Sequence, residues 1–368
     1  MDLYQFLTPP ADTARRKGPH DRIVMSSRIR LARNIKDAAF PGWAKKPERV
    51  RVLELIRPAI EGLPEMKDSF SEAMDTLTTL EKNILVERHL ISREHAAKSA
   101  GSGIVLNHDE TLCVMINEED HLRMQSLRHG LQLRQAWAAI DQADSALEKK
   151  LEFAFSPELG YLTACPTNIG TGIRVSAMLH LPGLVLAEQI NPIIQSVNKL
   201  GLAVRGLYGE GTEALGNVFQ VSNQMTLGES ESAIVERLEK VLAQIIEHEE
   251  NARATLLEKK PKVVFNHIGR AYGILANAHS ISSKETMNLL SLMRLGVDLG
   301  LFPGMDRSLV DELFILTQPA HLQKQHSEKL SAEERDLLRA DMVRERLKPI
   351  SRPVARPPAP PGGGLDKQ

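Results

Sequence analysis

Two short apolar runs separated by a polar tetrapeptide constrain the fold of this chain more than any other feature. Residues 103–106 and 112–116 are apolar, and Asn107-His108-Asp109-Glu110 stands between them. Runs of this length around a short polar loop are typical of a β-hairpin, whose two strands are antiparallel. The sequence therefore predicts an antiparallel or mixed sheet, and residues 161–164, 202–204 and 218–221 are further strand candidates.

Helical periodicity dominates the later part of the chain. Between residues 232 and 253, apolar side chains recur on one face at the helical period. The charged stretch 259–262 contains Pro261 and indicates a domain boundary, after which residues 263–347 have an all-helical pattern. A helix around residues 287–299 is apolar almost all round, which indicates either deep burial or packing on a partner subunit.

The predicted fold class is therefore α+β, with an antiparallel sheet flanked by helices and then an all-helical C-terminal domain. We divide the chain into a short N-terminal arm (1–20), a sheet-containing domain (21–258) and a helical domain (263–347). The tail 349–368 is rich in Pro and Gly, and we expect it to be disordered.

Charge and composition exclude several classes of protein. The chain has 368 residues, with 46 Lys and Arg against 47 Asp and Glu, so it lacks the overall basic charge of a nucleic-acid binder. No apolar run approaches the roughly 20 residues needed to cross a bilayer, and the N-terminus has no signal-peptide pattern. Two cysteines, Cys113 and Cys165, exclude a disulfide framework. We expect a cytoplasmic protein without nucleic-acid or membrane partners.

Two arginines in the stretch Ser26-Ser27-Arg28-Ile29-Arg30 suggest an anion site. Arg28 and Arg30 alternate at period two, so on a strand both point to the same side. Two guanidinium groups on one side would bind an anion, and Arg binds phosphate bidentately. The alternative interpretation is an ordinary solvated strand face.

Three more segments combine an arginine with acidic residues or glycines. Arg123 follows the acidic cluster 118–120, Arg174 follows the Gly170-Thr171-Gly172 loop, and Arg205 precedes a glycine-rich loop with acidic residues. A solvated turn, or an ordinary loop, is the alternative for each of them. If the segments converge, five arginines form a cationic site suited to a polyphosphate, with carboxylates beside it for a cationic substrate. This arrangement favours nucleotide-dependent phosphoryl transfer.

These four segments, in this order, resemble the phosphagen (guanidino) kinase family. The matching stretches are 26–30, 117–123, 165–174 and 205–210. A closer resemblance to the bacterial protein-arginine kinase branch is carried by residues 30–34, 216–217, 220–224, 226–228 and 292–300. The resemblance extends over about residues 20–347.

The resemblance implies a catalytic domain that binds ATP on its sheet. It assigns Glu119 as the catalytic carboxylate, Glu210 as a second carboxylate on a mobile loop, and Cys165 as a reactive thiol near the guanidinium. Mg²⁺ would bridge the phosphates and be held mainly by them and by water, so no dedicated protein metal site is expected. The implied nucleotide-binding residues are Ser26, Ser27, Arg28, Ile29, Arg30, His89, Arg123, Arg174, Val175, Ser176, Ala177, Met178, Arg205, Gly206, Leu207, Tyr208, Gly209 and Glu210.

The number of residues before the first of these segments bears on the substrate. Small-molecule members of the family carry a helical domain there, but only 25 residues precede Ser26. We therefore expect an open site that phosphorylates arginine residues of proteins and so marks them for regulation or degradation. The alternatives are a kinase for a free small guanidine such as arginine, and a non-catalytic adaptor.

The same branch implies a role for the C-terminal helices in dimerisation, an activator protein, a protease-chaperone partner and a function in stress response. Residues 335–340 resemble its phosphoarginine-sensing motif, with Arg335, Asp336, Arg339 and Ala340 as the allosteric residues. Arg335 and Arg339 are four residues apart, so on a helix they share a face and could grip one phosphate. An ordinary charged helix face is the alternative.

Overall fold

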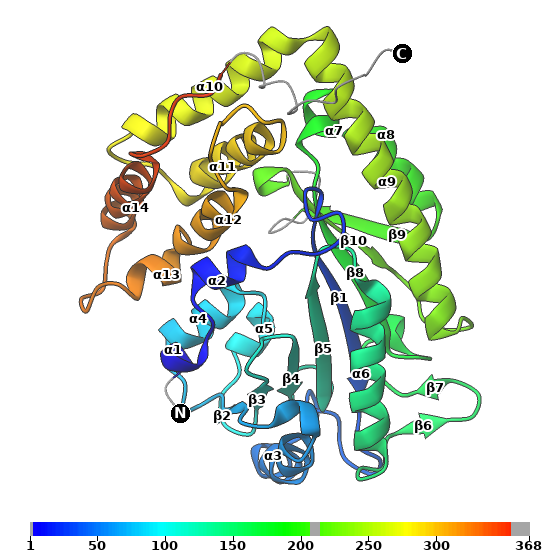
Figure 1. Ribbon diagram of the computed structural model, residues 1–368. Coiled ribbons are helices and arrows are strands. Elements are labelled where there is room, and N and C mark those ends of the chain that lie inside the picture. Colours follow the sequence, from blue (N-terminus) through cyan, green and yellow to red (C-terminus); the bar gives the residue numbers. More distant parts are fainter. Residues whose placement is uncertain (1–2, 207–213, 355–368) are drawn as a thin grey trace, which may run out of the picture.

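Residues 3–206 and 214–354 are described by a computed structural model of the chain (Figure 1). Within them, eight strands form one sheet in the order β2-β3-β4-β5-β1-β8-β10-β9, and every neighbouring pair is antiparallel. The strands of this sheet are β1 (Val24–Arg33), β2 (Phe70–Ala73), β3 (Gly103–Leu106), β4 (Leu112–Ile116), β5 (Leu122–His129), β8 (Ile173–His180), β9 (Leu202–Gly206) and β10 (Val218–Asn223).

The predicted hairpin is confirmed as β3 and β4. The strand expected at 161–164 is wrong in its extent, because only Gly160–Tyr161 (β7) is extended and paired, with β6 (Phe155–Ser156), in a separate two-stranded sheet. Residues 162–164 instead lead directly to Cys165 as irregular chain.

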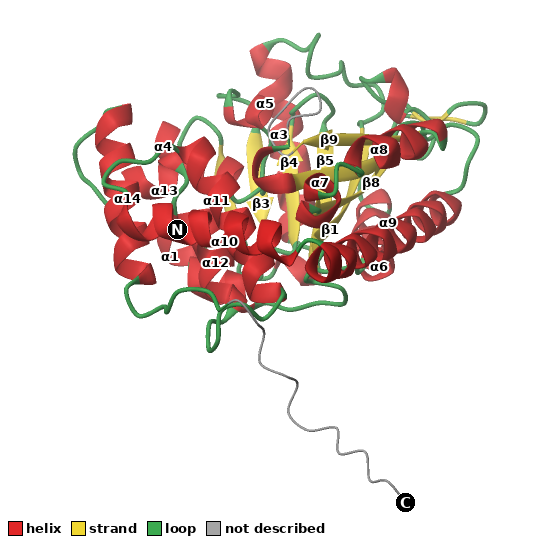
Figure 2. Ribbon diagram, turned by 90° about the horizontal axis from the view of Figure 1, so that it is seen from above, coloured by secondary structure: helices red, strands yellow, loops and turns green. Residues whose placement is uncertain are grey.

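Helices cover the sheet and make up the C-terminal region (Figures 1 and 2). Those before the end of the sheet are α1 (Leu3–Phe6), α2 (Pro10–Arg15), α3 (Lys46–Glu61), α4 (Thr79–Glu87), α5 (Arg93–Ala96), α6 (Leu133–Glu148), α7 (Pro182–Leu186) and α8 (Ile190–Lys199). Those after it are α9 (Glu231–Lys259), α10 (Pro261–Asn277), α11 (Ser283–Asp298), α12 (Arg307–Leu316), α13 (Pro319–Gln323) and α14 (Ala332–Leu347). The predicted helical C-terminal region is thus confirmed.

The main core lies between one face of the sheet and the helices α6 and α9. Alternate side chains of the central strands, such as Ile29 and Val175, are fully buried there against Ile140 of α6 and Leu238 of α9. Figure 1 shows α6 and α9 on one side of the strands and α10–α14 gathered on the other. On the second face, Cys113 and Met115 of β4 belong to a smaller apolar cluster. The central strands β1, β5 and β8 present polar side chains on that face, and these form the candidate site.

The N-terminal arm packs into the molecule. Leu3 and Phe6 are buried in a cluster with Phe70 of β2 and Ile84 of α4. Arg88, just after α4, pairs with the buried Glu110, and it also donates to the Thr8 carbonyl. These contacts tie residues 3–15 to one edge of the sheet.

The apolar helix predicted around residues 287–299 corresponds to α11. Met287, Leu290 and Met293 of this helix are buried within the chain, in a cluster built from α10, α11, α12 and α14. Of the two predicted alternatives, burial inside the chain is therefore the one observed. Helix α9 ends at Lys259 and α10 begins at Pro261, which occupies the first turn, where its missing N–H leaves no hydrogen bond unmade.

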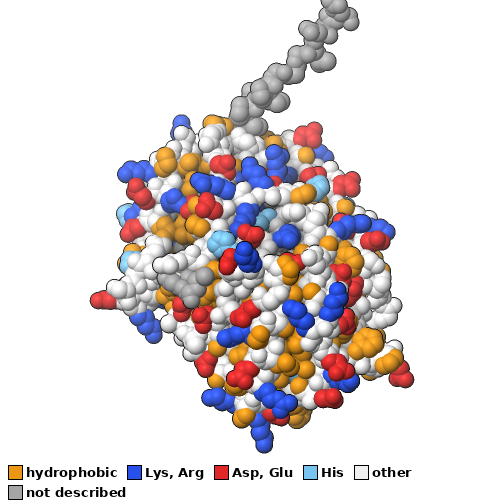
Figure 3. All heavy atoms as spheres, turned by 60° about the horizontal axis from the view of Figure 1, so that its bottom comes forward, with side chains coloured by type: hydrophobic (Ala, Val, Ile, Leu, Met, Phe, Trp, Pro, Cys, Tyr) orange, Lys and Arg blue, Asp and Glu red, His pale blue; other side chains and the backbone are white. Residues whose placement is uncertain are grey.

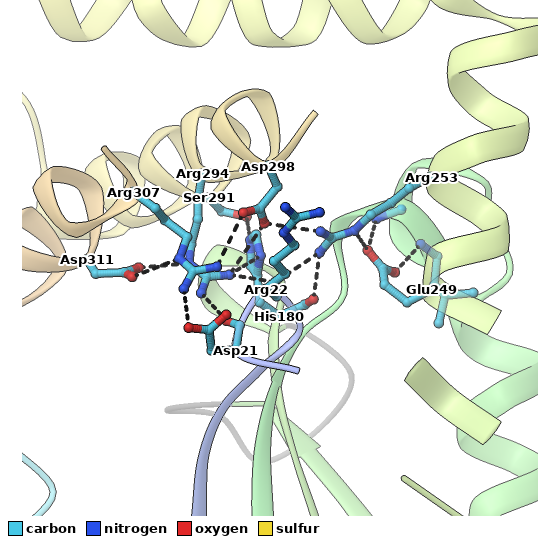
Figure 4. Close-up of polar contacts among 12 residues, drawn as sticks. Asp21, Arg22, His180, Glu249, Arg253, Ser291, Arg294, Asp298, Arg307 and Asp311 are labelled. Atoms are coloured by element: carbon cyan, nitrogen blue, oxygen red, sulfur yellow. Dashed lines mark hydrogen bonds and ion pairs between the residues drawn. The ribbon is translucent and has the colours of Figure 1, made fainter. Parts of the chain in front are cut away.

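A buried polar network joins the C-terminal helices to the sheet (Figure 4). Arg294 of α11 donates to the carbonyls of Asp21 (2.9 Å) and Arg22 (3.0 Å) just before β1. It also donates to Nδ1 of His180 at the end of β8 (3.0 Å). Burial, and next the charge of Arg294, lowers the pKa of His180 well below its usual value, so the ring is neutral and accepts this hydrogen bond. Its Nε2–H then donates to Ser291 Oγ (2.9 Å).

Candidate active site

The strand register brings the predicted arginines to one face of the sheet. Arg30 in β1 lies opposite Arg174 in β8, and Ala32 in β1 lies opposite Arg123 in β5. Directly opposed residues share a face, and so do residues two apart on one strand, such as Arg28 and Arg30. Three adjacent strands therefore present four guanidinium groups on the face that α6 and α9 do not cover.

Arg205 reaches the same face from β9 at the edge of the sheet. It lies opposite Gln220 in β10, which lies opposite Met178 in β8. Met178 is four residues beyond Arg174 on one strand, so both side chains share a face. Burial, and next the charge of Arg205, lowers the pKa of Arg174, so the two guanidinium groups repel each other across β10.

Four residues that the resemblance assigned to the nucleotide have side chains on the opposite face. Ser27, Ile29, Val175 and Ala177 are at most 1% exposed, and all but Ser27 belong to the apolar core. Ser27 Oγ donates to the Gly130 carbonyl (2.7 Å) at the turn between β5 and α6. Strand alternation turns these four side chains into the core, so a contact with the nucleotide would involve their backbone, and their assignment stays a prediction. Ser26, Ser176 and Met178 do share the face of the arginines.

Arg123 pairs with Glu118 and Glu119, but Arg28, Arg30 and Arg174 are crowded together and have lowered pKa values. Burial, and next Arg123 and Arg174, lowers the pKa of Arg28 to about 10. Burial, followed by Arg28 and the other arginines, lowers the pKa of Arg30 well below its usual value. Among the described residues, the buried Nε atoms of Arg30 and Arg174 have no hydrogen-bond acceptor. An anion bound on this face would both relieve the repulsion and accept these hydrogen bonds.

Neutral side chains of β10 hold two of these arginines in place. Arg28 Nη2 donates to Gln220 Oε1 (2.9 Å), and Arg174 Nη2 donates to Ser222 Oγ (3.2 Å). Gln220 and Ser222 both lie in the stretch 220–224 that carries the family resemblance, but neither was predicted to be a site residue. Their spacing of two on an expected strand is the same signal that identified Arg28 and Arg30.

The acidic cluster after β4 divides into two buried structural residues and one accessible carboxylate. Asp120 accepts hydrogen bonds from Asn34 Nδ2 and from the Ala164 backbone N–H (both 2.6 Å). Glu118, 2% exposed, accepts from Arg123 (2.7 Å) and from the Ser92 hydroxyl. The interpretation of this cluster as a solvated turn is therefore wrong for Glu118 and Asp120. Both are buried, and hydrogen-bond partners compensate for their burial.

Glu119 alone of the three lines the cavity that also contains Cys165, and its side chain is 41% exposed. It accepts a hydrogen bond from Arg123 Nη1 (2.6 Å). Burial raises the pKa of Glu119, while the charge of Arg123 opposes this shift. A carboxylate with a raised pKa is a stronger base than an ordinary glutamate.

The cavity beside Glu119 has a volume of about 160 Å³ and also contains the predicted thiol. Cys165 lies on its wall, with Sγ 3.1 Å from Thr167 Oγ1. Further lining residues are Arg30, Arg123, Asn168, Gly172 and Arg174. Gly172 has a φ of 67°, and a Cβ there would lie 2.6 Å from the Ala32 carbonyl oxygen, so this close approach of the loop to β1 requires glycine.

A second cavity of about 190 Å³ is lined by Arg28 and shares no described lining residue with the cavity beside Glu119. His89 and Met178 line it from the sheet side, and Phe314 and Gln318 line it from the C-terminal helices. Burial, and next the charge of Arg28, lowers the pKa of His89 to about 4, so its ring is neutral at pH 7. The structure thus places the predicted His89 beside the arginines, although they are distant in sequence.

Some predicted site residues lie outside the described part of the chain. Leu207, Tyr208, Gly209 and Glu210 fall in the segment 207–213, and Gly206 ends β9 just before it. Most of the Pro- and Gly-rich tail, from residue 355, also lies outside the described residues.

Arg335 and Arg339, the two arginines of α14 predicted to bind phosphoarginine, have different hydrogen-bond partners. Arg339 is buried, and it donates to the carbonyls of Thr317 (2.8 Å) and Ile281 (2.9 Å) and to the Asp336 carboxylate. Arg335 donates instead to the Leu330 carbonyl (3.0 Å). Arg339 thus joins α14 to its neighbours, and the binding of a phosphate by this pair stays a prediction. Ala340 is also buried.

Within residues 3–206 and 214–354, no group of three or more His, Cys, Asp and Glu side chains is placed to hold a metal ion. No helix in the same residues is both long enough and apolar enough to cross a membrane. On the face seen in Figure 3, acidic and basic side chains are interspersed, in keeping with the formal net charge of −1.

Comparison with known protein families gives one match in the sheet-containing region and another in the C-terminal helical region. Residues 51–252 match the family described as ATP:guanido phosphotransferase, C-terminal catalytic domain. Residues 261–357 match the protein-arginine kinase McsB C-terminal domain. The first match ends within α9, and the second begins at Pro261, the first residue of α10.

Individual relatives agree with these matches. The protein-arginine kinase of Halothermothrix orenii is 46% identical over 331 residues, which are 90% of this chain and 95% of that protein. That of Bacillus licheniformis is 47% identical over 351 residues, which are 95% of this chain and 96% of that protein.

Solved structures of guanidino kinases share the fold. A lombricine kinase superposes with a TM-score of 0.57 at 27% identity, covering 67% of this chain and 72% of that one. A duplicated taurocyamine kinase from Schistosoma mansoni, solved with transition-state analogue components, gives a TM-score of 0.58 at 27% identity. That match covers 68% of this chain, which spans 35% of the duplicated protein. The chain therefore belongs to the ATP:guanido phosphotransferase family and carries, after the catalytic domain, the C-terminal domain of the protein-arginine kinases.

Proposed function

We propose that this protein transfers the γ-phosphoryl group of ATP to the guanidinium group of arginine side chains in proteins. The observation that carries the proposal is the convergence of five arginines on one face of the sheet, next to Glu119 and Cys165 in a shared cavity. The similarity to protein-arginine kinases over at least 90% of the chain supports a protein substrate.

The phosphates of ATP would lie against the arginine face. Arg28, Arg30 and Arg174 have lowered pKa values because of burial and mutual repulsion, and a polyphosphate would compensate for both. Among the described residues that line the cavity with Cys165, Glu119 is the one carboxylate. Mg²⁺ would therefore be held mainly by phosphate oxygens and water. When bound, Mg²⁺ supplies charge neutralisation at the phosphates.

The nucleoside of ATP would occupy the cavity between the sheet and the C-terminal helices. That cavity begins at Arg28, so a nucleotide can span both cavities with its phosphates on the arginines. Neutral His89 and the side chains of Met178 and Phe314 offer surfaces for a flat, mostly apolar base.

The guanidinium of the substrate would enter beside Glu119. A charged guanidinium is a poor nucleophile because its pKa is above about 12, so it must be oriented and must lose a proton as its nitrogen attacks phosphorus. Glu119 would hold the planar group and accept this proton, and its raised pKa suits that task. We assign Cys165 to the wall next to the guanidinium and Glu210, outside the described residues, to the second carboxylate. Arginines around the phosphoryl group would stabilise its charge in the transition state.

Replacing Glu119 by glutamine tests this proposal. Glu119→Gln removes the proton acceptor but keeps the size of the side chain, so phosphoarginine formation on an arginine-rich protein should fall at least about a hundredfold. ATP affinity should change only a few-fold, because the arginines remain. The measurement is phosphoarginine detection under conditions that preserve the acid-labile bond, together with calorimetric titration of ATP.

Glu61→Gln, at the exposed end of α3, is the matched control and should retain full activity. An unaltered rate in Glu119→Gln would refute the assigned role. Free arginine belongs in the same assay: turnover comparable with that of the protein substrate would favour the small-guanidine alternative.

The finer features of the protein-arginine kinase branch are part of this proposal. We assign to the protein a cytoplasmic location, a homodimer formed through the C-terminal helices, an activator, a protease-chaperone partner and a role in stress response. The match of residues 261–357 to the McsB C-terminal domain supports the dimer and the partners. Phosphoarginine sensing at residues 335–340 would require Arg339 to exchange its present carbonyl partners for a phosphate.

A further inference from the structure

A third cavity, of about 620 Å³, is lined by Glu119 and shares no described lining residue with the nucleoside cavity. It shares Glu119 and Arg123 with the cavity that holds Cys165, so the two are continuous at the proposed site of transfer. Phe40, Trp43 and Glu94 line its outer part. This volume exceeds what one guanidinium group needs, and none of the proposed steps uses it.

Trp43 stands out among the described residues because its large apolar side chain is 88% exposed. Tryptophan is enriched in the centres of protein interfaces, where its burial contributes much of the binding free energy. An indole left almost fully in water beside an active site is therefore a strong indication of a surface that another polypeptide covers.

The backbone around Trp43 is held firmly. The backbone N–H groups of Trp43 (2.8 Å) and Ala44 (2.9 Å) both donate to the Phe40 carbonyl. Arg49 Nη1 donates to the Ala44 carbonyl (2.7 Å). The exposed indole therefore projects from a rigid turn, which lowers the entropy lost on binding.

The same turn is connected to the acidic cluster that carries Glu119. His121, two residues after Glu119, lies edge-on to Phe40 with ring centroids 6.2 Å apart, and its Nε2 is 3.0 Å from the Ala39 carbonyl oxygen. Asn34 donates to Asp120 (2.6 Å). The position of Trp43 relative to Glu119 is thus fixed through short contacts on both sides.

The charge on the wall of this cavity favours a basic ligand. Its described lining has three carboxylates, Glu94, Glu118 and Glu119, against two cations, Lys98 and Arg123, so its formal charge is net negative. Arg123 is already paired with Glu118 and Glu119. Glu94 is exposed on α5 and is available to a cation. An arginine or lysine side chain next to the phosphorylated arginine could pair with Glu94 and lie on the face of Trp43.

We propose that this cavity binds the extended polypeptide segment that flanks the target arginine, with Trp43 and Glu94 as residues that determine substrate specificity. The inference rests on the proposed function, since it names the surface on which the protein substrate lies. It predicts a preference for target arginines that have a second basic residue nearby.

Steady-state kinetics of a Trp43→Ala variant tests the inference. For an unfolded, arginine-rich protein the KM should rise about tenfold, because an interface tryptophan is lost. The KM for ATP should stay unchanged, because Trp43 lines neither the nucleoside cavity nor the cavity with Cys165. Glu94→Gln should raise the KM mainly for substrates with a basic neighbour, and it should weaken the salt dependence of binding.

Phe155→Ala is the matched control, because it removes another exposed aromatic ring (57% exposed), from the separate two-stranded sheet. Its KM for protein should equal that of the wild type. Binding without turnover is read from tryptophan fluorescence in a Trp137→Phe background, since the chain has two tryptophans. A peptide with lysine in place of the target arginine should quench Trp43, and a peptide without basic residues should not.

Three outcomes separate the possibilities. If the wild type phosphorylates proteins but Trp43→Ala has an unchanged KM, the docking surface is wrong and the proposed function stands. If the wild type phosphorylates no protein, the proposed function fails, whatever the fluorescence shows. If Trp43→Ala converts a dimer to a monomer in analytical ultracentrifugation, the surface binds a second copy of this chain and the inference is overturned.

Discussion

At the scale of single residues, the candidate site is unfavourable for the stability of the empty protein. Arg30 is partly buried, its pKa is depressed by burial and by three neighbouring arginines, and its Nε has no acceptor among the described residues. A side chain in this situation destabilises the fold unless an anion is bound. Such sites are common where binding has been selected at the expense of stability.

Replacing Arg30 by methionine should therefore stabilise the protein and weaken nucleotide binding together. We expect the free energy of unfolding without ATP to rise by about 1 kcal/mol, since a repelled charge is exchanged for an apolar side chain of similar length. ATP affinity should fall at least about tenfold with the loss of one phosphate-binding guanidinium. Urea denaturation and calorimetry measure the two effects.

Arg51→Met on the exposed surface of α3 is the control, and both quantities should stay at the wild-type values. A loss of stability in Arg30→Met would show that Arg30 contributes to folding, and the proposed conflict between stability and binding would then be wrong.

At the scale of secondary-structure elements, buried carboxylates stabilise the starts of short helices that have no side-chain cap of their own. Glu249 of α9 accepts hydrogen bonds from the backbone N–H groups of Gly183 and Leu184 (both 2.8 Å) in the first turn of α7. Glu87 does the same for Ala320 and His321 at the start of α13. A negative charge at a helix N-terminus satisfies otherwise unpaired donors.

Removing the Glu249 carboxylate should destabilise the fold strongly. Glu249→Ala leaves two buried N–H groups without an acceptor and deprives Arg253 of its closest partner, at 2.6 Å. The expected loss is about 3–5 kcal/mol of unfolding free energy, measured by urea denaturation. Glu250→Ala, the next residue on the exposed side of α9, should change stability by less than about 0.5 kcal/mol. Similar values for the two variants would contradict the capping role.

At the scale of the whole molecule, the C-terminal helices are joined to the sheet by charge as well as by apolar packing. Arg294, 2% exposed, pairs with Asp311 of α12 (2.7 Å) while it also contacts the chain before β1 and the end of β8 (Figure 4). Arg253 of α9 pairs with Asp298 of α11 (3.1 Å) in the same network. Because the nucleoside cavity is lined from both regions, this network also fixes the shape of that cavity.

Arg294→Ala should loosen the docking of the C-terminal helices. The variant leaves buried acceptors without a donor, at an expected loss of about 3–5 kcal/mol. Both tryptophans, Trp43 and Trp137, lie before α9, so tryptophan fluorescence reports on the sheet-containing region. Circular dichroism reports on all helices, including those of the C-terminal region. The wild type should show coincident transitions by both methods, and the variant should lose helical signal before fluorescence changes.

Arg270→Ala, exposed on α10, should behave as the wild type in the same experiment. Coincident transitions in Arg294→Ala would mean that apolar packing alone couples the two regions.

Much of the fold and part of the site could be predicted from local sequence patterns. The hairpin, the helical C-terminal region and the shared face of Arg28 and Arg30 each depend on spacing along one segment. The acidic cluster was harder to interpret, because the burial of Glu118 and Asp120 depends on Ser92 and Asn34, which are distant in sequence. Likewise, Arg335 and Arg339 share a helix spacing, but their partners come from other segments.

The sequence by itself determined the antiparallel sheet, the helical C-terminal region and the family resemblance, because hydrophobic periodicity and contiguous motifs are local properties. Only the tertiary structure decided which arginine Nε atoms lack an acceptor, that Glu119 alone of its cluster lines the cavity with Cys165, and that Trp43 stands exposed in the neighbouring cavity. The physical reason is that burial, hydrogen-bond satisfaction and pKa depend on neighbours brought together by folding.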